Sequence, residues 1–100
     1  MLGEKLKSLR ESKKLLLKDV ARQLDVDIAF LSRLENNEKA VNRHHLASFA
    51  AIYSVNEKDL LPLWMGQRVL HLVAEEIDEE HTEKALKLVL NDIKKHHDNR

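Results

Sequence analysis

Apolar residues recur every three or four positions along most of the chain, which is the spacing of one face of an α-helix. In the first part of the chain this pattern predicts five helices, over residues 2–13, 17–24, 28–36, 43–53 and 57–61. No strand-like alternation occurs, so the predicted fold class is all-α. The residues expected on the inner faces of the helices are Leu2, Leu6, Leu9, Val20, Ala21, Leu24, Leu31, Leu34, Leu46, Phe49, Ala50 and Tyr53.

Polar residues mark the ends of these helices. Three helices are preceded by a residue whose side-chain oxygen can accept a free backbone N–H of the first turn: Asp27, Asn42 and Asn56. Asn36 and Asn37 are expected to end the third helix, because Asn tolerates the left-handed conformation common at a C-cap. Pro62 is expected to end the fifth helix.

Beyond the fifth helix, two more apolar stripes predict helices over residues 64–78 and 81–96, or alternatively one long bent helix. An acidic segment separates the stripes. Their members are Val69, Leu70, Val73 and Ile77 before it, and Ala85, Leu86, Val89, Leu90 and Ile93 after it. We therefore expect a helical domain of residues 1–62 and a C-terminal helical extension of residues 63–100.

Charge and composition narrow the function classes. The chain has 17 Lys and Arg against 17 Asp and Glu, but residues 1–43 carry ten basic and seven acidic residues, a local excess of +3. A neutral total argues weakly against unspecific nucleic-acid binding and still permits a local basic face. With no cysteine, disulfides and thiol chemistry are excluded. The chain shows no secretory signal and no membrane-spanning run, which indicates a cytoplasmic protein.

The second and third predicted helices are joined by the short connection 24–27, which makes them cross steeply, as in a helix-turn-helix. A set of apolar and polar residues surrounds this connection at characteristic positions. They are Leu6, Leu9, Arg10, Asp19, Val20, Ala21, Leu24, Val26, Leu31, Ser32, Arg33, Leu34, Glu35, Asn36, Leu46, Phe49, Ala50, Leu60 and Leu61. In these residues, positions 2–61 resemble the lambda-repressor-like helix-turn-helix family of phage and bacterial repressors.

The resemblance implies a five-helix DNA-binding domain whose third helix enters the major groove of DNA. It also implies that Arg10 and Glu35 form an ion pair between the first and third helices; the alternative is two unrelated surface charges. Ala21 is small where the second and third helices pack closely, and Val26 fills the turn. These features all serve to fix the third helix.

If Leu31 and Leu34 face inward, the outer face of the third helix points away from the core. The family uses that face to contact DNA, so the expected base-reading residues are Ile28, Ala29, Ser32 and Arg33. Arg33 can pair bidentately with guanine or hold a phosphate. Ile28 can contact a thymine methyl group, or pack against a neighbouring helix or a partner. Phosphate contacts are expected from Lys18, Asn36, Lys39 and Arg43.

The chain also departs from the family pattern. The family usually has a polar cap and then Gln at the start of the second helix, where this chain has Leu16 and Leu17. Asp25 and Asn37 replace two glycines, although both tolerate positive φ. Acidic side chains near the expected DNA face weaken the attraction to phosphates. The apolar run that begins at Leu15 can also mark a protein contact.

Other chemistry has little support in the sequence. The six histidines include no pair at helical metal-ligand spacing, and the serines lack the glycine-rich context of a nucleophile. The acidic segment is typical of a solvated helix end. We therefore predict a protein that is not an enzyme and that uses no metal or cofactor.

The sequence thus predicts a transcriptional regulator that binds double-stranded DNA, most simply a homodimeric repressor of its own or linked genes. The C-terminal extension is expected to mediate dimerisation, to match a two-fold operator, or else to complete the monomer's core. The expected dimerisation residues are Val69, Val73, Ile77, Leu86, Val89, Leu90 and Ile93. Two alternatives are a protein-interaction module with DNA binding reduced or lost, and a regulator whose C-terminal helices hold an effector pocket.

Overall fold

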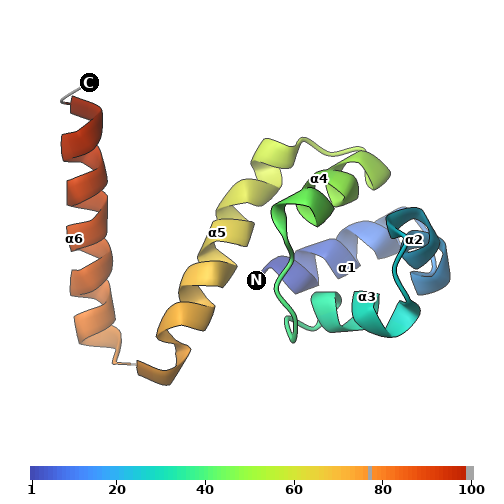
Figure 1. Ribbon diagram of the computed structural model, residues 1–100, viewed down its shortest axis with the longest axis horizontal. Helices are drawn as coiled ribbons and strands as arrows, with labels where there is room; N and C mark the ends of the chain where they lie inside the picture. The colour runs from blue at the N-terminus through green and yellow to red at the C-terminus, as the bar shows by residue number, and fades with distance from the viewer. Residues whose placement is uncertain (77, 99–100) are drawn as a thin grey trace. The chain divides into compact units, whose positions relative to one another are not determined.

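A computed structural model describes residues 1–76 and 78–98 (Figure 1). These residues form six α-helices, one short 3-10 helix and no strand, which confirms the predicted all-α class. The α-helices are α1 (Leu2–Ser12), α2 (Leu17–Leu24), α3 (Ile28–Glu35), α4 (Arg43–Ile52), α5 (Glu57–Val73) and α6 (Glu79–Asp98). The chain divides into two compact units, Met1–Val69 and Leu70–Arg100.

The first unit has one continuous hydrophobic core. α3 contacts both α1 and α2, and α2 also contacts α4. Every residue predicted for the core is buried, except that Leu9 is half-buried against it. Val41 and Leu60 join this core from the loop before α4 and from α5. The periodic apolar pattern alone therefore located the interior of this unit.

Local side-chain bonds begin the helices where the sequence predicted. The carboxylate of Asp27 accepts a hydrogen bond from the backbone N–H of Phe30 at 2.7 Å, and Asn42 caps α4 in the same way at 2.7 Å. Asn56 Oδ1 accepts the N–H of Lys58 at 2.9 Å. The three predicted N-caps are thus confirmed, and each satisfies a donor that the first helical turn leaves free.

Pro62 lies inside α5, so the predicted end of the fifth helix at this proline is wrong. A proline removes one helical hydrogen bond and crowds the preceding turn. Tertiary contacts hold the following turns in place: Trp64 Nε1 donates to the carbonyl of Val41 at 2.6 Å, and Gln67 Oε1 accepts the N–H of Leu2 at 3.3 Å. These bonds fix this part of α5 within the first unit and outweigh the local preference of proline.

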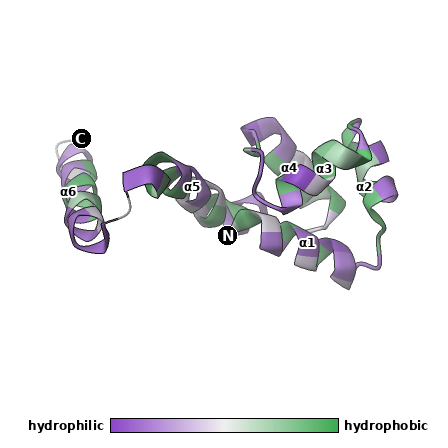
Figure 2. Cartoon of the chain, turned by 90° about the horizontal axis from the view of Figure 1, so that it is seen from below, coloured by the Kyte–Doolittle hydropathy of each residue, from purple (hydrophilic) through white to green (hydrophobic). Residues whose placement is uncertain are grey.

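The last helices differ from the prediction in their bounds. Instead of separate helices over residues 64–78 and 81–96, α5 runs on to Val73, a 3-10 turn covers Ala74–Glu76, and α6 begins at Glu79. The predicted break between two helices at the acidic segment is confirmed, and the alternative of one long bent helix is wrong. No described residue from 70 to 97 is buried, although hydrophobic positions recur along α6 (Figure 2). None of the described helices is long and apolar enough to cross a membrane.

Candidate nucleic-acid interface

The connection between α2 and α3 is a tight turn built from backbone bonds. Asp25 closes α2 in the left-handed conformation, with φ 59°, and the N–H of Val26 donates to the carbonyl of Ala21 at 3.0 Å. Asp27 then caps α3. Val26 is half-buried and packs against the core. The substitution of Asp for the usual glycine is therefore accommodated, because short polar residues enter this conformation at low cost.

Asp19 partly replaces the cap that Leu16 cannot provide. Leu16 occupies the N-cap position of α2 and has no side-chain acceptor for a helical N–H. Its own backbone N–H donates to the carboxylate of Asp19 at 2.9 Å, which is one half of a capping box. The negative charge of Asp19 also lies in the first turn, where it interacts favourably with the helix dipole. α2 is therefore held at its start by one side-chain hydrogen bond.

Arg10 and Glu35 form a buried ion pair between α1 and the end of α3. Arg10 Nε donates to Glu35 Oε2 at 2.8 Å and a terminal guanidinium nitrogen donates to Oε1 at 3.1 Å. A third bond goes to the carbonyl of Leu15 at 3.0 Å. The hydrogen bond to Glu35 raises the pKa of Arg10. Because the two hydrogen bonds of this bidentate pair are geometrically specific, they fix the orientation of α3 relative to α1.

A second contact fixes the same end of α3. The N–H of Gly3 donates to Asn37 Oδ1 at 2.8 Å, and Asn37 Nδ2 donates to Glu4 Oε1 at 2.6 Å. Asn37 has φ 60°, so it also replaces a glycine in the left-handed region. A Cβ atom on Gly3 would lie 2.3 Å from the carbonyl oxygen of Glu35. The close approach of α1 to α3 therefore requires glycine at position 3.

The residues predicted to read bases lie on α3, and most of their surface is accessible. Ala29 and Arg33 are exposed, Ile28 is 50% exposed and Ser32 is half-buried. Within the part of the chain that the structure describes, the Arg33 guanidinium has no hydrogen bond or ion pair. The helix is thus held from its inner face while its outer face remains available for contact.

Three of the residues predicted to hold phosphates are also on the surface. Lys18 and Asn36 are exposed, at the start of α2 and the end of α3. Lys39 is exposed, and its Nζ lies 5.5 Å from the centre of the Phe30 ring. Phe30 is half-buried. A cation over an aromatic face is attracted to it, so Lys39 is directed toward the start of α3.

Arg43, the fourth predicted phosphate contact, is engaged within the protein. Its Nε donates to Glu57 at 3.0 Å, and its guanidinium carbon lies 5.5 Å from the centre of the Trp64 ring. Arg68 stands over the same ring at 4.8 Å. Sequence reasoning missed this cluster, because its members are far apart in the chain. A phosphate would have to compete with Glu57 for Arg43.

Acidic and apolar side chains share this surface with the basic ones. Asp25 and Glu38 are exposed, and Leu16 is 57% exposed at the start of α2. The acids reduce the attraction to a phosphate backbone. Leu16 adds one apolar side chain to the surface at the start of α2. The electrostatic part of any DNA affinity therefore rests on a few lysines and arginines.

The α2–turn–α3 arrangement, with α3 exposed on its outer face, defines a helix-turn-helix, a fold class of DNA-binding proteins. The model of the helix-turn-helix domain family matches residues 3–63, and the chain belongs to this family. This match confirms the resemblance predicted over residues 2–61. Neither a curated protein nor a solved structure matches the chain. The described residues contain no cluster of three potential metal ligands.

Proposed function

We propose that this protein is a sequence-specific transcriptional regulator of the cytoplasm, a dimeric repressor of its own or linked genes. The observation that carries the proposal is the contrast between the two faces of α3. Its inner face is fixed by the buried Arg10–Glu35 pair and by Asn37, while Arg33 is exposed on the outer face without a partner among the described residues. A rigid helix with a free guanidinium suits base recognition in the major groove.

The proposed contacts divide into two kinds. Arg33 and Ser32 would read base edges, and Ile28 and Ala29 would contact thymine methyl groups. Lys18, Asn36 and Lys39 would hold phosphates, and Arg43 would join them if it exchanged Glu57 for DNA. Base contacts set the preferred sequence, whereas phosphate contacts set the affinity and its salt dependence.

Dimerisation completes the proposal. Repressors of this fold class bind two half-sites about one helical turn apart, so two α3 helices have to be linked. Six of the seven predicted dimerisation residues are exposed or half-buried: Val69 ends the first unit, and the other five lie in the C-terminal unit. Ile77 lies outside the described residues. Burial of this apolar surface against a second chain would stabilise the dimer.

The test is DNA selection from a random pool, followed by fluorescence anisotropy at two salt concentrations. We expect one palindrome to be enriched. Arg33→Ala should weaken binding by about 10- to 100-fold and relax one base position in each half-site. Lys18→Ala should weaken all sequences alike and lower the salt slope by about one per site. Lys58→Ala, which removes the same charge from an exposed position on α5, is the matched control.

A second function is favoured by one observation, the exposed apolar side chain of Leu16 at the start of α2. A protein-interaction module on the same fold would present this side chain to another protein. If selection enriches no sequence and binding stays weak at low salt, the regulator proposal fails and the interaction module takes its place.

A further inference from the structure

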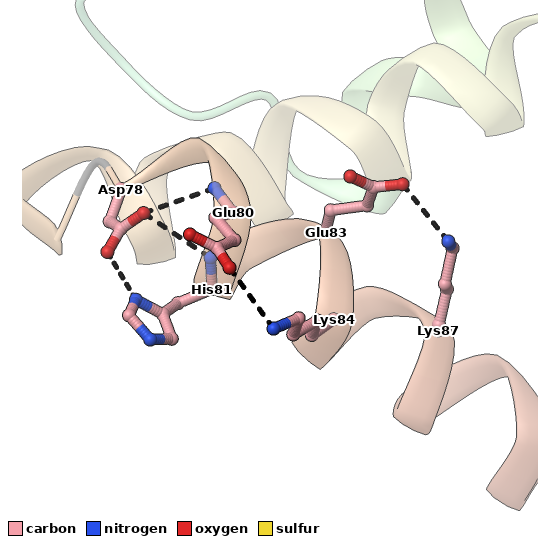
Figure 3. A network of polar contacts seen from close by, with 6 residues as sticks. All are labelled: Asp78, Glu80, His81, Glu83, Lys84 and Lys87. Carbon is pink, nitrogen blue, oxygen red and sulfur yellow. Dashed lines mark hydrogen bonds and ion pairs between the residues drawn. The ribbon is translucent and has the colours of Figure 1, made fainter.

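Charged side chains gather at the start of α6 and around the ring of Trp64. At the start of α6 they pair with one another: Asp78 with His81, Glu80 with Lys84 and Glu83 with Lys87 (Figure 3). Each pair joins residues three or four positions apart on one helix turn, so these contacts belong to the helix itself. Around Trp64 the charges come from two helices, and they do not balance.

Two guanidinium groups lie over the ring of Trp64. The guanidinium carbon of Arg43, at the start of α4, is 5.5 Å from the ring centre. That of Arg68, four residues after Trp64 on α5, is 4.8 Å from it. The face of an aromatic ring attracts cations, and guanidinium groups stack on it. Both groups are so near one ring that salt screens their mutual repulsion only in part. The ring therefore holds together two positive charges that would otherwise separate.

Only one acid is paired with these two cations. Glu57 accepts a hydrogen bond from Arg43 Nε at 3.0 Å, and the side chain of Arg43 is still 59% exposed. Arg68 is exposed, and its guanidinium has no hydrogen bond or ion pair with any residue that the structure describes. This Trp64 cluster of two arginines and one glutamate thus has an excess positive charge and unused N–H donors. Such a group of donors suits a phosphate, whose oxygens accept several bonds at once.

The Trp64 cluster is fixed to the connection that follows the third helix. Trp64 Nε1 donates to the carbonyl of Val41 at 2.6 Å, so the ring is tied to the loop between α3 and α4. Asn36 and Lys39, two of the proposed phosphate contacts, are exposed earlier in the same connection. A helix in the major groove has a phosphate strand on either side. Basic residues that follow the end of α3 are therefore suited to one of these strands.

We propose that Arg68 and Arg43, held on Trp64, together bind a phosphate of the DNA backbone, and that Glu57 competes with this phosphate for Arg43. The inference rests on the DNA binding of the proposed function and adds α5 to the interface. It does not depend on the choice of sequence, because phosphate contacts carry no sequence information. Arg68 becomes a candidate only through the fold, which brings α5 next to the start of α4.

Fluorescence anisotropy of the full chain tests the role of Arg68 on two duplexes, one obtained by the selection and one of unrelated sequence. Arg68→Ala should weaken binding to both by about fivefold at about 50 mM salt, and this difference should shrink about threefold at about 200 mM. Arg68→Lys should keep the salt slope of the wild type, because a phosphate contact needs the charge. Lys7→Ala, which removes an exposed cation from α1, is the matched control.

Two results would overturn the role of Arg68. If Arg68→Lys lost as much affinity and salt slope as Arg68→Ala, the arginine would act only by stacking on the ring, since lysine lacks the planar group. If Arg68→Ala bound both duplexes as Lys7→Ala does, DNA would not contact the Trp64 cluster, and an acidic protein would become its partner. Circular dichroism of each variant verifies that the fold is intact.

Glu57→Gln tests the competition for Arg43. This change removes the carboxylate charge and keeps the shape of the side chain, so DNA binding should tighten by about threefold. Asp59→Asn, at an exposed position two residues farther along α5, controls for the loss of any negative charge. In the Arg43→Ala background Glu57→Gln should have no effect, because nothing is left to compete for. Equal tightening by Asp59→Asn, or tightening without Arg43, would refute the competition.

These outcomes can be separated from those of the proposed function. Binding that depends on Arg68 and on salt, but is equal for the two duplexes, would sustain the phosphate contact and refute the sequence-specific regulator. A strong preference for the selected duplex that Arg68→Ala leaves unchanged in strength and salt slope would do the reverse.

Discussion

The two units of this chain both consist of amphipathic helices, but they differ in how far their apolar faces are buried. In Met1–Val69 the apolar stripes face one another, and residues such as Leu6, Leu31 and Phe49 have no exposed surface. In Leu70–Arg100 the described residues of the apolar stripes are not buried, and Val89 and Leu90 are 54% and 56% exposed. Similar helices therefore form a buried core in the first unit and leave an exposed apolar surface in the second.

This difference shows that the spacing of apolar residues determines which face of a helix is apolar. It does not determine what covers that face. The first unit has several short helices joined by tight turns, so each helix finds a neighbour within the chain. The second unit has the end of α5 and α6, too few elements to enclose a core. Its apolar surface therefore contributes to stability only when something outside this unit covers it.

The sharpest way to test this comparison is to remove one large apolar side chain from each unit. Phe49→Ala should lower the free energy of unfolding by about 3–5 kcal/mol, because it leaves a cavity beside Tyr53 in a small core. Leu88→Ala should change it by less than about 0.5 kcal/mol, since Leu88 is mostly exposed. Urea denaturation followed by circular dichroism measures both. Equal losses would show that the second unit has a core.

The ion pairs offer the next largest contrast. Arg10→Ala should cost about 3 kcal/mol, because it leaves Glu35 buried without its cation. Arg43→Ala removes a similar pair with Glu57, but one that is exposed, and should cost less than about 1 kcal/mol. The same denaturation experiment compares the two variants.

The control for this contrast is the double variant Arg10→Leu with Glu35→Leu. It should recover much of the loss, because no buried charge remains unpaired. Glu35 raises the pKa of Arg10, so the contribution of Arg10 is complete below its ordinary pKa and disappears only as the pH rises through the raised one. The difference between the arginine variants should therefore persist from neutral to mildly alkaline pH. A loss that vanished over that range would contradict this assignment.

The two glycines sharpen the comparison at a finer scale. Gly3→Ala should destabilise the protein by about 1–3 kcal/mol, since its new Cβ would meet the backbone of Glu35. Gly66→Ala should be neutral or stabilising by up to about 1 kcal/mol, because it improves helix propensity and meets only the flexible end of Met1. Thermal unfolding of the two variants side by side tests this expectation. A harmless Gly3→Ala would mean that α1 and α3 are not closely packed.

The smallest effect concerns Tyr53, whose hydroxyl is buried without a hydrogen-bond partner among the described residues. Burial raises the pKa of Tyr53 above the ordinary value of about 10. The folded state thus holds this proton more tightly than the unfolded state. The resulting stability is complete below about pH 10 and is lost as the pH rises from there toward the raised pKa.

Tyr53→Phe should therefore match or exceed the wild type at neutral pH by up to about 1 kcal/mol, and it should lose less stability in alkali. Unfolding curves at neutral and alkaline pH measure the gap between the two proteins. A gap that did not widen with pH would argue against titration of Tyr53 in the unfolded state as its cause.

Much of the first unit could be predicted from local sequence. Asp27, Asn42 and Asn56 mark helix starts because a cap needs only its own helix, and the core positions follow from periodicity. The positive φ of Asp25 and Asn37 was likewise foreseen from residue type. The helix-turn-helix class follows from these features together.

The remaining features depend on contacts that no local pattern contains. Proline breaks helices in isolation, yet α5 runs through Pro62 because Trp64 and Gln67 bind residues that are distant in the sequence. Arg43 was expected to be free for DNA, and only the fold brings Glu57 and Trp64 to it. By itself, the sequence determined which faces are apolar and where the helices of the first unit begin. The tertiary structure decided which of those faces found a neighbour, because burial depends on how many elements can meet in one place.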